Sequence, residues 1–221
     1  MAVYNNEETI DTSVNSILSQ TYEDFEFLIV DDFSNDLTYE KLKKIQKKDK
    51  RIKLYRNPKN IGLTASLNLL ISKSNFEYIA RQDGDDISLR ERLETQIYYL
   101  DTKHYDFCIS RARIKGSKKN IPRFTHHLPS RLVIKYKNPF IHGTLMIKKN
   151  VMLDLGSYNE LFYYAQDYKL FWDLLNKDIK FKYLKNVLYE LNMENNISKN
   201  KTNEQEYFRE CVVKGINPHQ D

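Results

Sequence analysis

Cysteine, proline, glycine and long apolar runs are all scarce in this sequence, and each shortage excludes a class of protein. The two cysteines among its 221 residues, Cys108 and Cys211, cannot form a disulfide framework, so we expect a reducing compartment. Five prolines and six glycines are too few for a loop-dominated all-β fold. No apolar run approaches the ~18 residues of a membrane-spanning helix. The start of the chain carries Glu7, Glu8 and Asp11, which a signal peptide would not. These absences predict a cytoplasmic globular chain.

Acidic residues are missing from one long stretch, 107–153. That stretch holds eleven bases, which are Arg111, Arg113, Lys115, Lys118, Lys119, Arg123, Arg131, Lys135, Lys137, Lys148 and Lys149. Because the whole chain has a net charge of only +5, the remainder is net acidic. A basic insert in an acidic body predicts that one face meets an anionic partner. A merely solvated basic surface is the plain alternative. Nucleic acid is a third interpretation, for which the stretch has no recognisable motif.

Strand-like and helical patterns alternate through the first half of the chain. Apolar-rich runs typical of strands cover 1–4, 25–30, 52–55 and 76–81, and segments with helical spacing separate them. Strands that alternate closely with helices indicate βαβ units. The sequence therefore predicts an α/β fold with a mainly parallel sheet and helices on both faces.

The second half is less regular, and no repeat or domain boundary is evident in it. The pattern predicts a strand at 106–114, a long basic connection at 116–138, a strand at 143–147, a helix at 167–175, one or two strands within 179–189, a polar loop at 192–203 and a last helix near 204–214. We therefore expect a single domain over 1–221.

Two acidic clusters, 31–32 and 83–86, follow predicted strands. Ligands bind at the carboxyl ends of strands in open α/β sheets, and gathered carboxylates repel one another unless a cation compensates. Asp83 and Asp85 therefore form a candidate half-shell for Mg²⁺ or Mn²⁺ bridging a diphosphate. The alternative is a simple Asp-Gly turn, with Asp86 or Ser88 capping the next helix. The spacing does not match an EF-hand calcium loop.

Asp167 is the third candidate. Leu170, Phe171, Leu174 and Leu175 lie three, four, seven and eight residues further on, which puts Asp167 on the buried face of a predicted helix. A carboxylate at the start of a helix and aimed inward is either a cap stabilised by the helix dipole or a catalytic base.

Taken together in chain order, these features resemble the family 2 glycosyltransferases, which have the nucleotide-sugar-binding GT-A fold. Four stretches carry the resemblance: VYNNE at 3–7, SILSQTYEDFEFLIVDDFSND at 16–36, the segment 57–68 around NIGL, and YIARQDGDD at 78–86. Two later pieces look like the family's acceptor-side strand and base helix, namely IHGTLM at 141–146 and QDYKLFW at 166–172. The likeness covers roughly residues 1–190. It implies a nucleotide-sugar half at about 1–105, an acceptor half with a smaller mixed region at about 106–190, and a polar tail with a helix at 191–221.

On the donor side, the resemblance implies a role for five residues. Val3 and Tyr4 would line the nucleotide pocket, and Asp32 would hydrogen-bond the uracil or other base. Asp83 and Asp85 would form the DXD motif that holds Mg²⁺ or Mn²⁺, with Asp85 as the direct metal ligand.

On the acceptor side, the resemblance implies that Asp167 is the general base and that His142 lies near the acceptor. The expected reaction is inverting transfer of one sugar, from a UDP-sugar or other nucleotide sugar, to a hydroxyl of a glycan or lipid-linked glycan. Such reactions build bacterial envelope polysaccharides. The alternative is a catalytically inactive fragment that binds sugar nucleotides.

Three departures from the family pattern bear on this reading. Only Met1 and Ala2 precede Val3, so we expect a shortened central strand and a chain that is truncated at its start. Gln166 stands where the family often has Glu, which leaves Asp167 without a like-charged neighbour. No Gln-x-x-Arg-Trp segment follows Asp167, which favours single-sugar transfer over polymer synthesis.

The basic stretch falls in the expected acceptor half, within 111–149. We expect it to dock peripherally on anionic lipid, or on a phosphorylated glycolipid acceptor, at the inner face of the cytoplasmic membrane. No nucleic-acid partner is expected.

Overall fold

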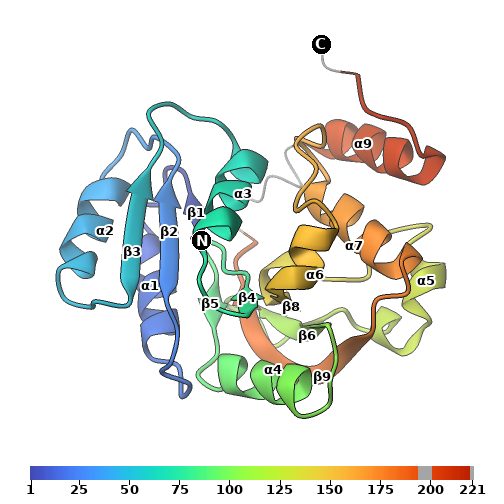
Figure 1. Ribbon diagram of the computed structural model, residues 1–221, viewed down its shortest axis with the longest axis horizontal. Helices are drawn as coiled ribbons and strands as arrows, with labels where there is room; N and C mark the ends of the chain where they lie inside the picture. Colours follow the sequence, from blue (N-terminus) through green and yellow to red (C-terminus); the bar gives the residue numbers. More distant parts are fainter. Residues whose placement is uncertain (194–200, 220–221) are drawn as a thin grey trace.

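The computed structural model describes residues 1–193 and 201–219 and arranges them around two β-sheets (Figure 1). The smaller sheet has three parallel strands in the order β1 (Ala2–Val3), β2 (Phe27–Asp31) and β3 (Ile52–Arg56). The larger sheet has the order β4 (Tyr78–Ala80), β8 (Met146–Lys148), β6 (Phe107–Ile114), β9 (Phe181–Leu191) and β5 (Ile87–Ser88), with β7 (Asn120–Ile121) paired to β6.

Helices cover both sheets. Their bounds are α1 (Ile10–Leu18), α2 (Thr38–Gln46), α3 (Leu63–Lys73), α4 (Arg92–Asp101), α5 (Ser130–Val133), α6 (Lys149–Asp154), α7 (Gln166–Asn176) and α9 (Thr202–Lys214), with 3₁₀ turns η1 (Thr125–His127) and η2 (His142–Thr144). No helix within the described ranges is long and apolar enough to cross a membrane.

The alternation of side chains along β2 explains how the smaller sheet is covered. Leu28 and Val30 pack in one apolar cluster with α3, and Phe27 and Ile29 pack in another with α1 and α2. Every residue of β2 is buried, as expected for a strand between two layers of helices. The α3 cluster continues through α7 to Cys211 in α9, so residues of both halves share one core.

The expectation of a mainly parallel sheet holds for the smaller sheet only. In the larger sheet β6 and β9 run parallel, whereas the pairs β4/β8, β6/β8, β5/β9 and β6/β7 are antiparallel. Parallel neighbours need a long crossover, and the connection from β6 to β9, which contains α7, supplies one. The fold is therefore mixed α/β.

Two local expectations also change. Ser88 does not cap a helix: it lies in β5, its hydroxyl donates to Gln82 Oε1 over 2.6 Å, and α4 begins at Arg92. The expected strand at 143–147 begins instead as the turn η2 and becomes β8 only at Met146. Much of the expected polar loop at 192–203 lies outside the described residues.

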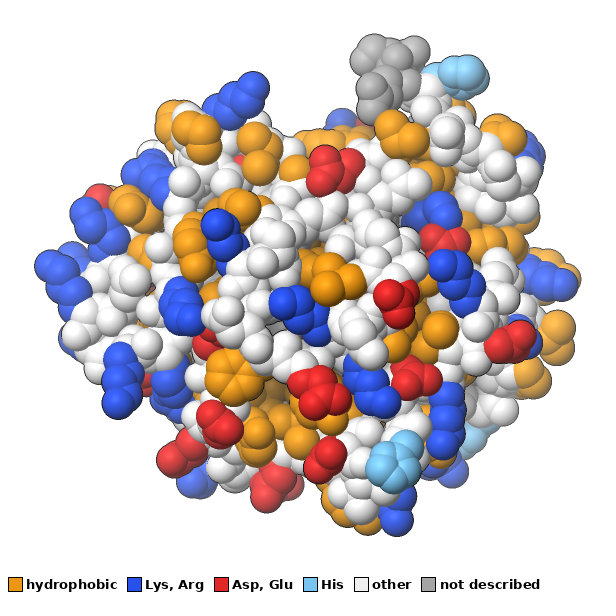
Figure 2. Space-filling model, in the orientation of Figure 1, with side chains coloured by type: hydrophobic (Ala, Val, Ile, Leu, Met, Phe, Trp, Pro, Cys, Tyr) orange, Lys and Arg blue, Asp and Glu red, His pale blue; other side chains and the backbone are white. Residues whose placement is uncertain are grey.

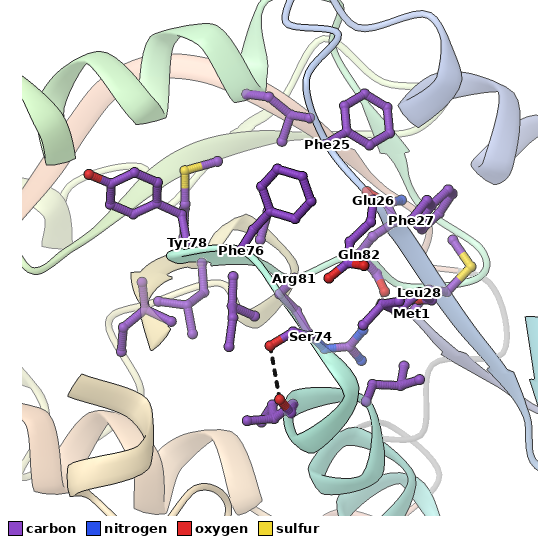
Figure 3. A pocket seen from close by; sticks show the side chains of 18 of the residues that line it. Met1, Phe25, Glu26, Phe27, Leu28, Ser74, Phe76, Tyr78, Arg81 and Gln82 are labelled. Carbon is purple, nitrogen blue, oxygen red and sulfur yellow. Dashed lines mark hydrogen bonds between the residues drawn. The ribbon is translucent and has the colours of Figure 1, made fainter. Parts of the chain in front are cut away.

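An apolar cavity of about 340 Å³ separates the two sheets, between β2 and β4 (Figure 3). Met1, Leu28 and Tyr78 are among its lining residues. The Met1 amino group donates to the Leu28 carbonyl over 2.9 Å. Most of the side chains that line the cavity are apolar, and none of the seven candidate site residues is among them.

Candidate active site

A polar cleft of about 1390 Å³ opens where β1, β2 and β4 end and where η2 and α7 begin. All seven candidate residues line it, namely Val3, Tyr4, Asp32, Asp83, Asp85, His142 and Asp167. The structure thus brings the donor-side and acceptor-side candidates to one space. Their individual roles stay predictions.

The first turn of the chain presents Tyr4 to the cleft. Val3 is buried at the end of β1, and Tyr4 is 45% exposed. The Asn5 amide donates to Ser34 Oγ over 3.0 Å, and the next amide donates to Thr38 Oγ1 over 2.7 Å. These bonds hold the turn against the loop after β2, so the Tyr4 ring stands at a fixed edge of the cleft.

Asp32 follows β2, and its carboxylate is largely engaged within the protein. Its Oδ1 accepts hydrogen bonds from Asn57 Nδ2 at 2.8 Å and from the Ile61 amide at 2.9 Å, and its Oδ2 accepts one from the Gly62 amide at 2.8 Å. Gly62 has φ of +86°, which a residue with a side chain would adopt only with strain. Each carboxylate oxygen has two acceptor sites, so one site remains at Oδ2 for a ligand N–H.

The Asp-Gly-Asp-Asp loop leaves β4 and packs directly on β1. A side chain at Gly84 would place its Cβ 2.8 Å from Val3 Cγ1, so the close approach requires glycine. Buried Arg81 forms an ion pair with Asp83 Oδ1 from beneath. The Asp83 amide donates to the hydroxyl of Tyr189 over 3.2 Å. The loop is therefore fixed on three sides.

The carboxyl groups of this loop destabilise one another's charged forms. Burial, followed by the charge of Asp83, raises the pKa of Asp85. The same two causes, together with the charge of Asp85, raise the pKa of Asp86 to about 8. Asp86 Oδ1 accepts a hydrogen bond of 2.7 Å from the Asn192 amide, which fixes its orientation without removing the repulsion.

This carboxylate set fits a divalent cation only in part. A cation would offset the repulsion that raises the pKa values of Asp85 and Asp86. Within 1–193 and 201–219, however, no group of three or more His, Cys, Asp or Glu is placed to hold a metal ion. Asp83 is already paired with Arg81. A bound Mg²⁺ or Mn²⁺ would thus depend on Asp85 and on oxygens from water or a diphosphate.

Asp167 is the second residue of α7, and Ala165 rather than Asp167 is the N-cap. Asn138 Nδ2 donates to Asp167 Oδ2 over 2.8 Å. Burial raises the pKa of Asp167, and hydrogen bonds from backbone amides and from Asn138 oppose that rise. The result is a carboxylate that faces the cleft and is more basic than an exposed aspartate.

His142 lies in η2 on the same side of the cleft as Asp167. Its Nε2 is 2.6 Å from the hydroxyl of Tyr158. Burial, helped by the charge of Arg81, lowers the pKa of His142 to about 3. The imidazole is therefore neutral near pH 7 and contributes hydrogen bonds rather than charge.

Four contributors to the site were not predicted from the sequence: Arg81, Asn138, Tyr158 and Tyr189. Asn138 lies at the end of the segment that the sequence predicts as a plain basic connection. Tyr158 and Tyr189 act through contacts with residues that are distant in the chain. The sequence held a signal only for Arg81, which lies two residues before the first aspartate of the acidic loop.

Known proteins resemble this chain in sequence and in fold. EpsE of Bacillus subtilis (strain 168) is 36% identical over 174 residues, which are 73% of this chain and 59% of EpsE. The protein named UDP-Glc:alpha-D-GlcNAc-diphosphoundecaprenol beta-1,3-glucosyltransferase WfgD, of Escherichia coli, is 29% identical over 177 residues, or 79% of this chain and 68% of WfgD. The chain thus spans three fifths to two thirds of these relatives.

A solved structure shares the fold at low identity. The mannosyltransferase PcManGT of Pyrobaculum calidifontis, in complex with GDP-Man and Mn²⁺, superposes with a TM-score of 0.77 at 16% identity, over 98% of this chain and 64% of PcManGT. This likeness confirms the expected GT-A architecture at the level of a mixed α/β fold. The family model described as glycosyl transferase family 2 matches residues 1–180. The chain therefore belongs to glycosyl transferase family 2.

Proposed function

We propose that this chain transfers one sugar from a nucleotide-sugar donor to a hydroxyl of a glycan or lipid-linked glycan, with inversion at the anomeric carbon. One observation carries the proposal: Asp85 and Asp167, which come from separate elements, line the same cleft. Such an arrangement places a site for a diphosphate opposite a base for an attacking hydroxyl.

Asp167 supplies the base. A hydroxyl is a weak nucleophile until its proton is accepted, and burial makes Asp167 more basic than an exposed aspartate. As the acceptor oxygen forms its bond to the anomeric carbon, its proton passes to Asp167. The bond from that carbon to the diphosphate breaks at the same time, and the leaving diphosphate keeps the electron pair. Asn138 holds the Asp167 carboxylate in place.

The donor half binds the nucleotide. Val3 and Tyr4 line the pocket, and the free acceptor site of Asp32 suits one N–H of a base such as uracil. The name of WfgD specifies UDP-Glc as its donor, which supports a UDP-sugar here. Asp85, with Asp83 held beside it by Arg81, would hold Mg²⁺ or Mn²⁺ together with the diphosphate. When bound, the cation would stabilise the negative charge that develops on the leaving group.

The acceptor is proposed to be a lipid-linked glycan. The name of WfgD specifies a diphosphoundecaprenol-linked sugar as its acceptor, and this relative aligns over 79% of the chain. A lipid acceptor requires the enzyme to work at the membrane surface, which we propose to be the inner face of the cytoplasmic membrane.

Donor turnover tests the proposal. We would measure release of UDP from UDP-glucose and other UDP-sugars with Mn²⁺, for the wild type and for Asp85→Asn and Asp167→Asn. Each variant should lose activity by about 10²–10³-fold, because each removes a group that acts in the transition state. Asp154→Asn, at the exposed end of α6, is the matched control and should keep full turnover.

The binding of UDP separates this proposal from an inactive sugar-nucleotide-binding fragment. Thermal unfolding with and without UDP and Mn²⁺ reports binding independently of turnover. A wild type that UDP stabilises but that turns over no donor would favour the inactive fragment. Wild-type turnover by Asp167→Asn would contradict its role as the base.

A further inference from the structure

The segment 123–137, which we name the docking segment, exposes apolar and basic side chains side by side. It contains η1 and α5. We propose that this segment inserts its apolar side chains into the surface of an anionic lipid bilayer. The expectation from the sequence is that the basic stretch as a whole is attracted to anionic lipid. The proposal here assigns membrane binding to one segment that has both apolar and basic side chains.

Burial divides the side chains of the docking segment into two groups. Val133 and Ile134 are 8% and 4% exposed, and α5 packs on α7 through contacts that include a hydrogen bond from the Tyr168 hydroxyl to the Ile134 carbonyl. The segment also leaves four large side chains in solvent, which are Phe124 at 73%, Leu128 at 54%, Leu132 at 58% and Tyr136 at 80% exposed. Tyr136 and Phe124 are the most exposed large apolar side chains of the described chain.

Basic residues alternate along the segment with these apolar residues. Arg123, Arg131, Lys135 and Lys137 are all exposed. Arg131 forms an ion pair with Asp178, whereas no ion pair is found for the other three within the described part of the chain. The sequence has no acidic residue from 107 to 153. The surface therefore complements a negatively charged partner that also accepts apolar groups.

A lipid surface meets both requirements at once. Aromatic rings such as those of Phe124 and Tyr136 are favoured at the boundary between headgroups and acyl chains, and basic side chains are attracted to anionic headgroups. Leu128 and Leu132 have no flat face on which a nucleic-acid base could stack, but they fit the acyl region. Charge and apolar character together favour anionic lipid over nucleic acid.

The docking segment ends beside the polar cleft. Tyr136 and Lys137, at its end, also line the polar cleft, and Asn138 follows with its bond to Asp167. Docking through this segment would turn the acceptor side of the cleft toward the bilayer. The value of this orientation rests on the proposed function, because it matters only if the acceptor is lipid-linked. The docking itself does not depend on the proposed function.

Basic side chains also gather at the opposite end of the molecule, and they supply a control. Figure 2 shows Lys and Arg over α2, at the left of the view, far from α5 in Figure 1. Lys44 and Lys47 are exposed there, and Leu37, the N-cap of α2, is 60% exposed. That end matches the docking segment in charge and in one apolar side chain, but it carries no comparable apolar face.

Co-sedimentation of the full chain with vesicles tests the proposal. We expect binding to vesicles of phosphatidylcholine mixed with phosphatidylglycerol, weaker binding in high salt, and little binding to pure phosphatidylcholine. Arg123→Gln with Lys135→Gln should weaken binding more than about tenfold, since each base near an anionic surface contributes about fivefold. Phe124→Ser with Leu132→Ser should weaken vesicle binding at least about tenfold. The binding that remains should depend on salt more strongly than that of the Arg123→Gln and Lys135→Gln variant.

The controls are Lys44→Gln with Lys47→Gln, and Leu37→Ser, and they should bind as the wild type does. Equal losses in controls and docking variants would overturn the proposal, as would a wild type that ignores anionic vesicles. Tighter binding to nucleic acid than to vesicles, lost in the same docking variants, would overturn it in favour of the nucleic-acid reading. UDP release without vesicles should be unchanged in every docking variant, so a failure of docking is distinct from a failure of catalysis.

Discussion

Asn138 donates a hydrogen bond of 2.8 Å to Asp167, across 29 positions of sequence. The bond joins the residue that follows the docking segment to the first turn of α7. It stabilises the charged form of a carboxyl group that burial would otherwise leave protonated over a wider pH range. Asn138 is therefore a positioning residue that keeps Asp167 both oriented and ionised.

Replacing Asn138 by Ala should move the acidic limb of the pH–rate profile to higher pH. The base must be deprotonated to act, and loss of the donor raises the pKa of Asp167 further. One such hydrogen bond is worth about 1–1.5 kcal/mol, so the limb should move by about one pH unit or less. The measurement is kcat/KM against pH for UDP-sugar transfer. Asn150→Ala, on an exposed part of α6, is the control, and a variant limb that coincides with the wild type would contradict this role.

Replacing His142 by Gln should leave the shape of the pH–rate profile unchanged. The pKa of His142 is lowered to about 3, so this residue is already neutral across the range in which an ordinary histidine titrates. The rate of sugar transfer can fall in the His142 variant because the contact with the Tyr158 hydroxyl is lost, and Tyr158→Phe should reproduce that fall. Disappearance of a limb between about pH 6 and pH 7 in the His142 variant would show that the residue titrates during turnover.

Replacing Asp86 by Asn should change how stability depends on pH. The pKa of Asp86 is raised from 3.8 to about 8, so its stabilising protonated form is complete below pH 3.8 and is lost as the pH rises toward 8. The variant lacks this loss, so its free energy of unfolding relative to the wild type should grow across that window. Urea unfolding at several pH values measures the difference. Parallel pH dependences for the variant and the wild type would contradict the raised pKa of Asp86.

Replacing Gly143 by Ala should destabilise the protein by about 1–3 kcal/mol, because the new Cβ has no room. It would lie 2.5 Å from the Tyr189 hydroxyl oxygen and 2.7 Å from two ring carbons. Urea unfolding measures the loss. Gly143→Ala combined with Tyr189→Leu should cost less than the two single changes together, since the ring that causes the clash is gone. Simple additivity of the two would contradict a direct clash.

Local sequence patterns predicted the parts of the fold that local chemistry determines. The apolar run before Asp31 and Asp32 became β2, buried on both faces, and the spacing of Leu170, Phe171 and Leu174 correctly put a buried stripe on α7. The seven candidate residues were chosen from motifs, and the structure places all of them on one cleft. Motifs carry this information because each lies at the end of a regular element.

Pairing between distant segments could not be predicted in the same way. The antiparallel partners of β4 and β6 depend on β8, whose three residues have no strong period of their own. Ser88 looked like a cap because its neighbours suit a helix, but long-range pairing with Tyr189 placed it in a strand. Asn138 and Tyr158 gain their roles only from contacts across the fold.

The apolar cavity between β2 and β4 has a mechanical consequence. Hydrostatic pressure favours states that eliminate internal voids, and the effect scales with the void volume. The gap of about 340 Å³ at the junction of the two sheets is therefore a place where pressure should act on the packing between β2 and β4. An inert gas such as xenon, which occupies apolar voids, should bind there and oppose the effect of pressure.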